Sequence, residues 1–230
     1  MTDHKTKRVV VAIDGPAGAG KSTIARRLAE RLQFTYIDTG AMYRAVALWA
    51  LRLGVAPTDM HRLEQLALAA DIALDRGRIR LNGDDVTEAI RSQEAADGAS
   101  KVSAIPAVRR ALVAKQRAIG ERTSVVMEGR DIGTVVFPGA DVKIYLDADP
   151  EARVRRRLAD LRAQGDSVSE AQLAAQMKER DQRDSTRRDA PLAQAPDATY
   201  LDSTPLSLEE VEEAILRIVR ARITNGKEFS

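Results

Sequence analysis

Residues 14–23 read DGPAGAGKST, directly after the apolar run of residues 9–13. The stretch fits the pattern Gly-x-x-x-x-Gly-Lys-Ser, and it lies between an expected strand and an expected helix, where that pattern has its function. Glycines allow backbone N–H groups to turn inward around phosphate oxygens, and the N-terminus of a helix adds positive potential. The stretch therefore predicts a P-loop that binds a triphosphate. Its residues are Gly15, Pro16, Ala17, Gly18, Ala19, Gly20, Lys21, Ser22 and Thr23.

Two residues of this loop have expected chemical roles. Lys21 would reach the β- and γ-phosphates, and the hydroxyl of Ser22 would be a ligand of Mg²⁺. Such a loop usually has an acidic partner that follows another strand. Glu128, at the end of VVME and before a polar run, is the preferred partner and would bind the metal through water. Asp147, which could equally serve a turn, and Asp14 are the alternatives.

Strands and helices are expected to alternate along most of the chain. Apolar, β-branched runs predict five strands, at residues 8–13, 34–38, 125–127, 142–146 and 199–201. Apolar residues at helical spacing and capping residues predict helices at residues 21–32, 41–53 and 150–164, and after Ser169 and Ser207. This alternation is typical of an α/β fold, here a three-layer core with a five-stranded parallel sheet flanked by helices.

The segment of residues 55–103 interrupts that alternation. A helix is expected at residues 61–70, and the stretch IALDRGRIRLNGDDV follows it. Arg76-Gly77 and Asn82-Gly83-Asp84 are typical of turns between short antiparallel strands. We therefore expect an inserted small subdomain here, and a disordered tail at residues 225–230.

Composition excludes several classes of function. The 230 residues carry a net charge of +2 and only 3% aromatic residues, which gives no argument for binding to nucleic acid or to a membrane. The chain has no cysteine and two histidines, so thiolate catalysis and ordinary zinc sites are excluded. No signal peptide or long apolar stretch is evident, and no long apolar seam. A cytoplasmic monomer is therefore the default expectation.

Arginines are concentrated where phosphate recognition would need them. Between residues 153 and 188 there are nine arginines and one lysine. Arg180, Asp184 and Arg187 have the spacing of one helix face. A solvated charged face is the alternative, but such a face would use lysine as freely as arginine, whereas bidentate recognition of phosphate prefers arginine. Many arginines without a dedicated base suit an acceptor that is itself a phosphate.

Five stretches together resemble the bacterial cytidylate (CMP/dCMP) kinase family: GPAGAGKST, DTGAMYR, EGRDIGTVVFP, VKIYLDA and KERDQRD. The resemblance covers nearly the whole chain, and EGRDIGTVVFP and DTGAMYR are its most specific parts. It implies transfer of a phosphoryl group from Mg-ATP to CMP and dCMP. It also implies three parts: a core (1–38, 104–152 and 173–230), a monophosphate-binding subdomain (39–103) and a lid (153–172).

The resemblance also assigns roles to individual residues. Lys21, Arg130 and Arg180 would be catalytic, and Arg44 would bind phosphate with the two arginines. Asp131, with Ser100 and Arg109, would recognise the base. The acceptor-site positions are Thr39, Arg44, Ser100, Arg109, Arg130, Asp131, Arg180, Asp184 and Arg187, of which Asp184 and Arg187 would bind the sugar.

Hydrogen bonding supports a base-reading role for Asp131. Cytosine offers its exocyclic N4 amine as a donor to a carboxylate, whereas uracil presents the acceptor O4. The alternative for Asp131 is an ion pair with Arg130 alone.

Two other functions are open at this point. One is another small P-loop kinase, acting on UMP, AMP or a metabolite, which the EGRDIGT stretch and the insertion argue against. The other is a nucleotide-dependent switch ATPase, which a compact basic patch would favour. The arginines here are instead interleaved with aspartates, as in a small-molecule pocket.

Overall fold

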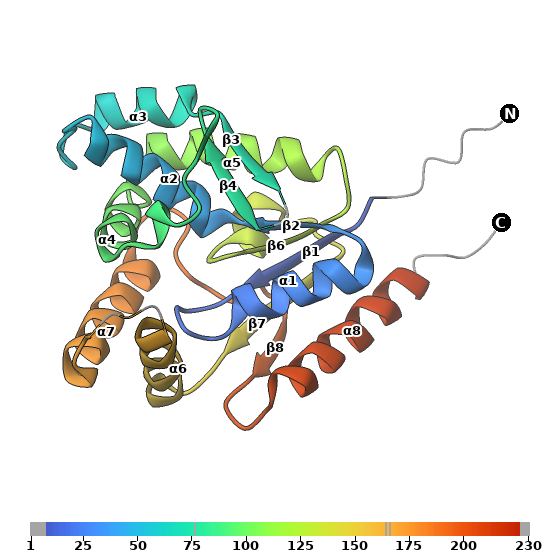
Figure 1. Cartoon of the computed structure of the whole chain (residues 1–230). Helices are drawn as coiled ribbons and strands as arrows, with labels where there is room; N and C mark the ends of the chain where they lie inside the picture. The colour runs from blue at the N-terminus through green and yellow to red at the C-terminus, as the bar shows by residue number, and fades with distance from the viewer. Residues whose placement is uncertain (1–7, 76, 164, 166, 226–230) are drawn as a thin grey trace, which may run out of the picture. The chain divides into compact units, whose positions relative to one another are not determined.

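The computed structural model describes residues 8–75, 77–163, 165 and 167–225 (Figure 1). Arg76 of the expected turn, residue 164 at the expected helix end and the tail after residue 225 lie outside these residues. Contacts divide the chain into two compact units, Met1–Thr35 with Gly120–Ser230, and Tyr36–Ile119. Within the described residues, none of the helices has the length and apolar character that crossing a membrane requires.

The main sheet has five strands in the order β2-β6-β1-β7-β8. These are β1 (Val10–Asp14), β2 (Thr35–Asp38), β6 (Val125–Gly129), β7 (Val142–Asp147) and β8 (Thr199–Asp202). β1 pairs in parallel with β6 and β7, and β7 pairs in parallel with β8. β1 and β6 are almost entirely buried, as expected for parallel strands that helices cover on both faces. The predicted α/β class with a five-stranded parallel sheet is confirmed.

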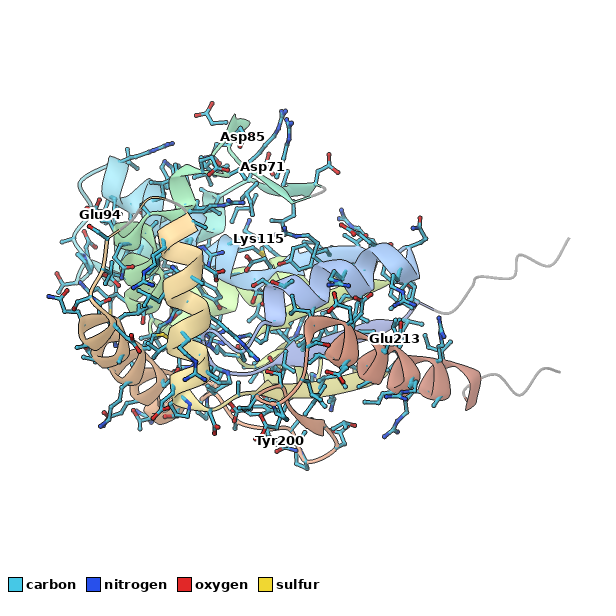
Figure 2. All side chains as sticks on the ribbon, turned by 60° about the horizontal axis from the view of Figure 1, so that its bottom comes forward. Asp71, Asp85, Glu94, Lys115, Tyr200 and Glu213 are labelled. Atoms are coloured by element: carbon cyan, nitrogen blue, oxygen red, sulfur yellow. The ribbon has the colours of Figure 1, made fainter. Side chains whose placement is uncertain are left out.

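Two helices of the first unit lie side by side against the sheet (Figure 1): α1 (Lys21–Leu32) and α8 (Leu208–Asn225). Arg27 forms an ion pair with Glu209, and Arg31 forms one with Glu213, which Figure 2 shows on α8. The predicted capping box before α8 is confirmed, because Ser207 and Glu210 each accept the backbone N–H of the other. These ion pairs join α8 to α1, the helix that follows the P-loop.

At the edge of the sheet that β8 forms, Tyr200 of β8 stacks on Tyr145 of β7, with ring centroids 6.2 Å apart. Tyr200 is exposed on this edge strand (Figure 2). Tyr145 is half-buried and lies beside Asp14 in the register of β7 with β1. The stack therefore covers the end of the sheet at which β1 enters the P-loop.

The remaining helices of this unit form a hairpin, α6 (Pro150–Ala163) and α7 (Glu170–Thr186). The hairpin has an apolar cluster of its own, made by Val154, Leu158, Leu161, Leu173 and Met177. Ser169 caps α7 by accepting the N–H of Gln172, as the sequence predicts. A shared cluster of buried side chains makes the two helices one packed element.

The second unit contains a small antiparallel sheet and a group of helices. The sheet is β3 (Ile72–Asp75), β4 (Arg78–Leu81) and β5 (Asp84–Asp85), which confirms the predicted antiparallel strands. Figure 2 shows Asp85 on its exposed side. The helices are α2 (Thr39–Arg52), α3 (Met60–Ala69), the short 3₁₀ turn η1 (Ala89–Arg91), α4 (Gln93–Val102) and α5 (Pro106–Gly120). α4 packs closely on α2, because a β-carbon at Gly98 would lie 3.0 Å from that of Ala47.

Two helix ends differ from the sequence-based expectation. α2 begins at Thr39 rather than at residue 41, because the side chain of Asp38 accepts the N–H of Ala41 and caps the helix. α7 ends at Thr186, and the next residue, Arg187, has extended backbone angles. The prediction that Arg180, Asp184 and Arg187 share a helix face is therefore wrong for Arg187. A one-turn π-helix at Ile132–Val136, η2, was not expected.

Candidate active site

The P-loop connects β1 to α1 in a backbone conformation that only glycine adopts easily. Gly15 has φ 150°, and a β-carbon there would lie 2.0 Å from the carbonyl oxygen of Leu146 on β7. Gly20 is the N-cap of α1 and has left-handed backbone angles. Because glycine has no side chain to cap the helix, the first N–H groups of α1 are left for another acceptor. An anion such as a phosphate group fits this requirement.

Lys21, the first residue of α1, is buried within the loop that precedes it. Its Nζ donates to the carbonyl oxygen of Pro16 at 2.6 Å. Burial and, next, the positive charge of Arg130 lower the pKa of this ammonium to about 7, and the carboxylate of Glu128 opposes the shift. The positive charge of Arg180 also lowers the pKa of Lys21. These interactions place Lys21 among the predicted site residues of the first unit.

Two arginines from different segments converge on one carboxylate of α7. Arg130 Nε lies 3.0 Å from Asp184 Oδ2, and Arg180 Nε lies 4.0 Å from the same oxygen. The Asp184 side chain is 7% exposed. Its burial would raise the pKa of the carboxyl group, but the charges of Arg130 and Arg180 hold that pKa below its ordinary value. Asp184 therefore accepts a hydrogen bond from Arg130 and forms a longer ion pair with Arg180.

A second ion pair lies in the same unit. Arg187 Nη2 is 3.5 Å from Asp131 Oδ1, and both side chains are buried. Arg187 thus has a carboxylate partner in the site although it lies outside α7. The partner seen for Asp131 is Arg187, so the alternative in which Asp131 pairs with Arg130 alone does not hold.

Asp14 anchors the segment that carries Arg130 and Asp131. Its two carboxylate oxygens accept the N–H groups of Ile132 and Gly133, each at 2.7 Å. Burial raises the pKa of Asp14 to about 6, although these two hydrogen bonds and Lys21 oppose the shift. Because both oxygens are occupied by backbone donors, Asp14 is suited to holding η2 rather than to binding a metal. Asp147, the other alternative, accepts the N–H of Ala148 with Oδ1 and so serves the turn after β7.

The raised pKa of Asp14 predicts a pH-dependent effect of Asp14→Asn on stability. The folded protein holds the Asp14 proton more tightly than the unfolded chain does, so ionisation of Asp14 costs stability as the pH rises through 6. Relative to the wild type, the variant should gain roughly 1 kcal/mol in free energy of unfolding between pH 5 and pH 7. Urea denaturation at both pH values measures this change. A difference between the two proteins that is constant with pH would show that Asp14 does not titrate in this range.

The second unit holds the predicted site residues Thr39 and Arg44. Thr39 is buried at the start of α2. Arg44 Nη2 donates to Asp38 Oδ2 at 2.8 Å, while the other oxygen of Asp38 caps the helix. Asp38 thus orients Arg44 and at the same time fixes the start of α2.

Ser100 and Arg109 are also buried in this unit. The Arg109 guanidinium lies over the ring of Tyr43, 5.8 Å from its centroid, and Nη1 donates to the carbonyl oxygen of Ser103 at 3.3 Å. A stacked, buried guanidinium is held in a fixed orientation, as recognition of a planar group requires.

The structure thus groups most of the predicted site residues by unit. The first unit brings together Lys21, Glu128, Arg130, Asp131, Arg180, Asp184 and Arg187. The second holds Thr39, Arg44, Ser100 and Arg109. The sequence analysis missed Asp38, the anchoring role of Asp14, and the ion pair of Arg153 with Asp181. In the sequence, only the positions of these residues within or next to the motifs could have pointed to their roles.

The donor groups at the P-loop fit a magnesium ion bound together with phosphate. Ser22 is exposed on the first turn of α1, and Glu128 is a buried carboxylate near the end of β6. Within the described residues no three histidine, aspartate or glutamate side chains gather as a self-sufficient metal site. Mg²⁺ is commonly held by one or two protein oxygens together with substrate phosphates and water. Ser22 and Glu128 can supply that protein share.

Comparison with known proteins agrees with these observations. The sequence pattern of the family described as cytidylate kinase matches residues 11–221. A cytidylate kinase of Solibacter usitatus (strain Ellin6076) is 73% identical over an alignment of 232 positions, which covers 100% of this chain and 100% of that protein. A cytidylate kinase of Geobacter sp. (strain M21) is 48% identical over 230 residues, 98% of this chain and 99% of that protein. A bifunctional pantoate ligase/cytidylate kinase of Synechococcus sp. (strain JA-3-3Ab) is 48% identical over 221 residues, 93% of this chain and 41% of that protein.

Proposed function

Because the chain belongs to the cytidylate kinase family, we propose that this nucleoside monophosphate kinase transfers the γ-phosphoryl group of Mg-ATP to CMP and dCMP. The products are ADP and CDP or dCDP. The observation that carries the proposal is the cluster beside the P-loop. In it, Arg130 and Arg180 converge on Asp184, and their positive charges lower the pKa of Lys21.

Electrostatics supplies most of the proposed catalysis. The N–H groups of the P-loop and Lys21 bind the phosphates of ATP. Arg130 and Arg180 offset the repulsion between two polyanions and stabilise the charge on the phosphoryl group as it moves. The acceptor phosphate is already an anion at neutral pH, so no general base is needed. In-line transfer then depends on the position of the guanidinium groups.

We assign recognition of the acceptor to the residues that the resemblance names. Asp131 accepts the N4 amine of cytosine, with Ser100 and Arg109 as further contacts to the base. Asp184 and Arg187 bind the sugar. Thr39 and Arg44 belong to the acceptor site too, and Arg44 binds its phosphate. The ion pairs of Asp131 and Asp184 with arginines support these roles, because they hold both carboxylates in place, and the charges of Arg130 and Arg180 keep the pKa of Asp184 below its ordinary value.

Mg²⁺ joins the reaction as part of Mg-ATP, with Ser22 as a direct ligand and Glu128 as a partner through water. When bound, the ion neutralises charge on the phosphates. The proposed division of labour assigns ATP to a core (1–38, 104–152 and 173–230), the acceptor to residues 39–103 and closure to a lid (153–172). A closed lid excludes water and so prevents hydrolysis of ATP. The enzyme acts in the cytoplasm as a monomer, and sedimentation tests the monomeric state.

Asp131→Asn should weaken the binding of CMP more than the binding of ATP. Asparagine replaces a carboxylate that only accepts by an amide that also donates, and its NH₂ group would face the N4 amine. We expect KM for CMP to rise roughly tenfold to a hundredfold, the cost of an unsatisfied polar contact, with KM for ATP nearly unchanged. Steady-state kinetics with each substrate varied measures both constants. An unchanged KM for CMP would remove Asp131 from the base site.

A coupled assay of ADP release with CMP, dCMP, UMP, AMP and dTMP tests the proposed function. Release should be fast with CMP and dCMP, slow with the other acceptors, and absent when Mg²⁺ is omitted. Fast release with UMP or AMP would assign the chain another acceptor. Release that is independent of every monophosphate would identify a hydrolase instead of a kinase.

A further inference from the structure

Arg153, on the first turn of α6, bridges the P-loop and α7. Its Nη1 donates to the carbonyl oxygen of Ala17 at 3.1 Å and to Asp181 Oδ2 at 2.6 Å, and its Nε donates to the carbonyl oxygen of Ala148 at 3.1 Å. We infer that Arg153 and Asp181 are positioning residues, which hold α7 and its Arg180 at the correct place beside the P-loop. The effect on transfer rests on the proposed function, whereas the structural coupling does not.

The burial of this ion pair distinguishes Arg153 from its neighbours on α6. The Arg153 side chain is 9% exposed, whereas that of Arg155 is 64% exposed and lies 3.8 Å from the exposed Glu151. A buried guanidinium is costly unless its charge and its N–H groups are satisfied. Three of the five N–H groups of Arg153, on Nε and Nη1, have acceptors within the protein. Because these donors already join three segments, Arg153 is suited to holding the protein together.

Gly18 provides an independent contact between the same elements. It has φ 76°, and a β-carbon there would lie 2.9 Å from the carbonyl oxygen of Arg153. The same β-carbon would lie 3.1 Å from the terminal methyl carbon, Cε, of Met177 on α7. The P-loop backbone therefore touches both helices of the hairpin, and the glycine permits that approach.

The hairpin transmits this contact to the catalytic cluster. Met177 belongs to the apolar cluster that joins α6 to α7, so the two helices pack as one element. Asp181 lies between Arg180 and Asp184 on α7. Its Oδ1 is buried and has no hydrogen-bond partner among the described residues, so the bond from Arg153 is what holds this carboxylate. Loss of that bond would let α7 shift relative to Lys21.

Arg153→Met and Asp181→Ala test the inference from the two ends of the pair. Each variant should lower kcat by about tenfold to a hundredfold, because a displacement of about 1 Å at a catalytic group has an effect of this size. KM for ATP and CMP should change less than about threefold, since neither residue touches a substrate. The double variant should lose no more activity than the worse single variant, because each change breaks the same bond. Arg183→Met, which removes an exposed ion pair of α7 outside the lid, is the control for activity and should keep the wild-type kcat.

Hydrogen–deuterium exchange tests the coupling without any assay of activity. Arg153→Met should speed exchange in the segment of residues 15–21 and in α7, while Arg155→Met should leave both unchanged. Either of two outcomes would overturn the inference: unaltered exchange in both segments, or a wild-type kcat in folded Asp181→Ala. If the wild type does not phosphorylate CMP but the exchange result holds, the proposed function fails and the positioning contact stands.

Discussion

Lys21→Met should lower turnover about a thousandfold while the protein stays folded. The ammonium is the cation of the P-loop closest to the transferred phosphoryl group in the proposed mechanism, and loss of one such group in a preorganised site has an effect of this order. The fold should survive, because burial already lowers the pKa of Lys21 to about 7 and methionine has no charge to bury. Measurements of kcat and of the melting temperature test both parts of this expectation.

Lys178→Met is the matched control for Lys21→Met. Lys178 lies on the exposed side of α7, and its replacement should leave both kcat and the melting temperature unchanged. Turnover by Lys21→Met within tenfold of the wild-type rate would remove Lys21 from the catalytic machinery. It would also remove the main support for a phosphate-binding P-loop.

Arg180→Ala should lower kcat about a hundredfold or more. Arg180 faces Asp184 together with Arg130, and its charge acts on Lys21, so its loss removes positive charge from the point where two polyanions would meet. KM for ATP should change little, because the P-loop is intact. Rapid-quench or steady-state kinetics with saturating CMP and ATP measures the loss.

The same helix supplies a control for Arg180→Ala. Arg183 lies one turn further along α7, forms an i,i+4 ion pair with Glu179 and has a side chain that is 37% exposed. Arg183→Ala should keep the wild-type kcat, because an exposed pair of this kind contributes little. Equal effects of the two substitutions on kcat would instead support the alternative interpretation, in which the arginines of α7 form a solvated charged face.

Much of the fold follows from local sequence patterns. A strand at residues 8–13, observed at Val10–Asp14, and the helix after Gly20 were predicted because an apolar run, a glycine pattern and helical spacing are adjacent in the chain. The caps at Ser169 and Ser207 were predicted from residues three positions apart, and the structure confirms the N–H of residues 172 and 210 as their donors. Features of this kind need only a short window of sequence.

The pairs that shape the candidate site could not be predicted in this way. Arg130 and Asp184 are 54 residues apart, Asp14 and Ile132 are 118 apart, and Arg153 and Ala17 are 136 apart. The sequence places each of these residues near the end of a strand or on a helix, but the partner depends on how the elements pack. Arg187 illustrates a limit of local patterns as well. The helical spacing predicted that the helix includes Arg187, whereas α7 ends one residue earlier.

The fate of the γ-phosphoryl group in a single turnover tests the central claim most directly. Enzyme in excess over γ-labelled Mg-ATP is mixed with CMP or with buffer, quenched, and the labelled products are separated. The account predicts that the label appears in CDP when CMP is present, and that almost none is released as inorganic phosphate in either mixture. Label released as inorganic phosphate at the same rate with and without CMP would contradict it.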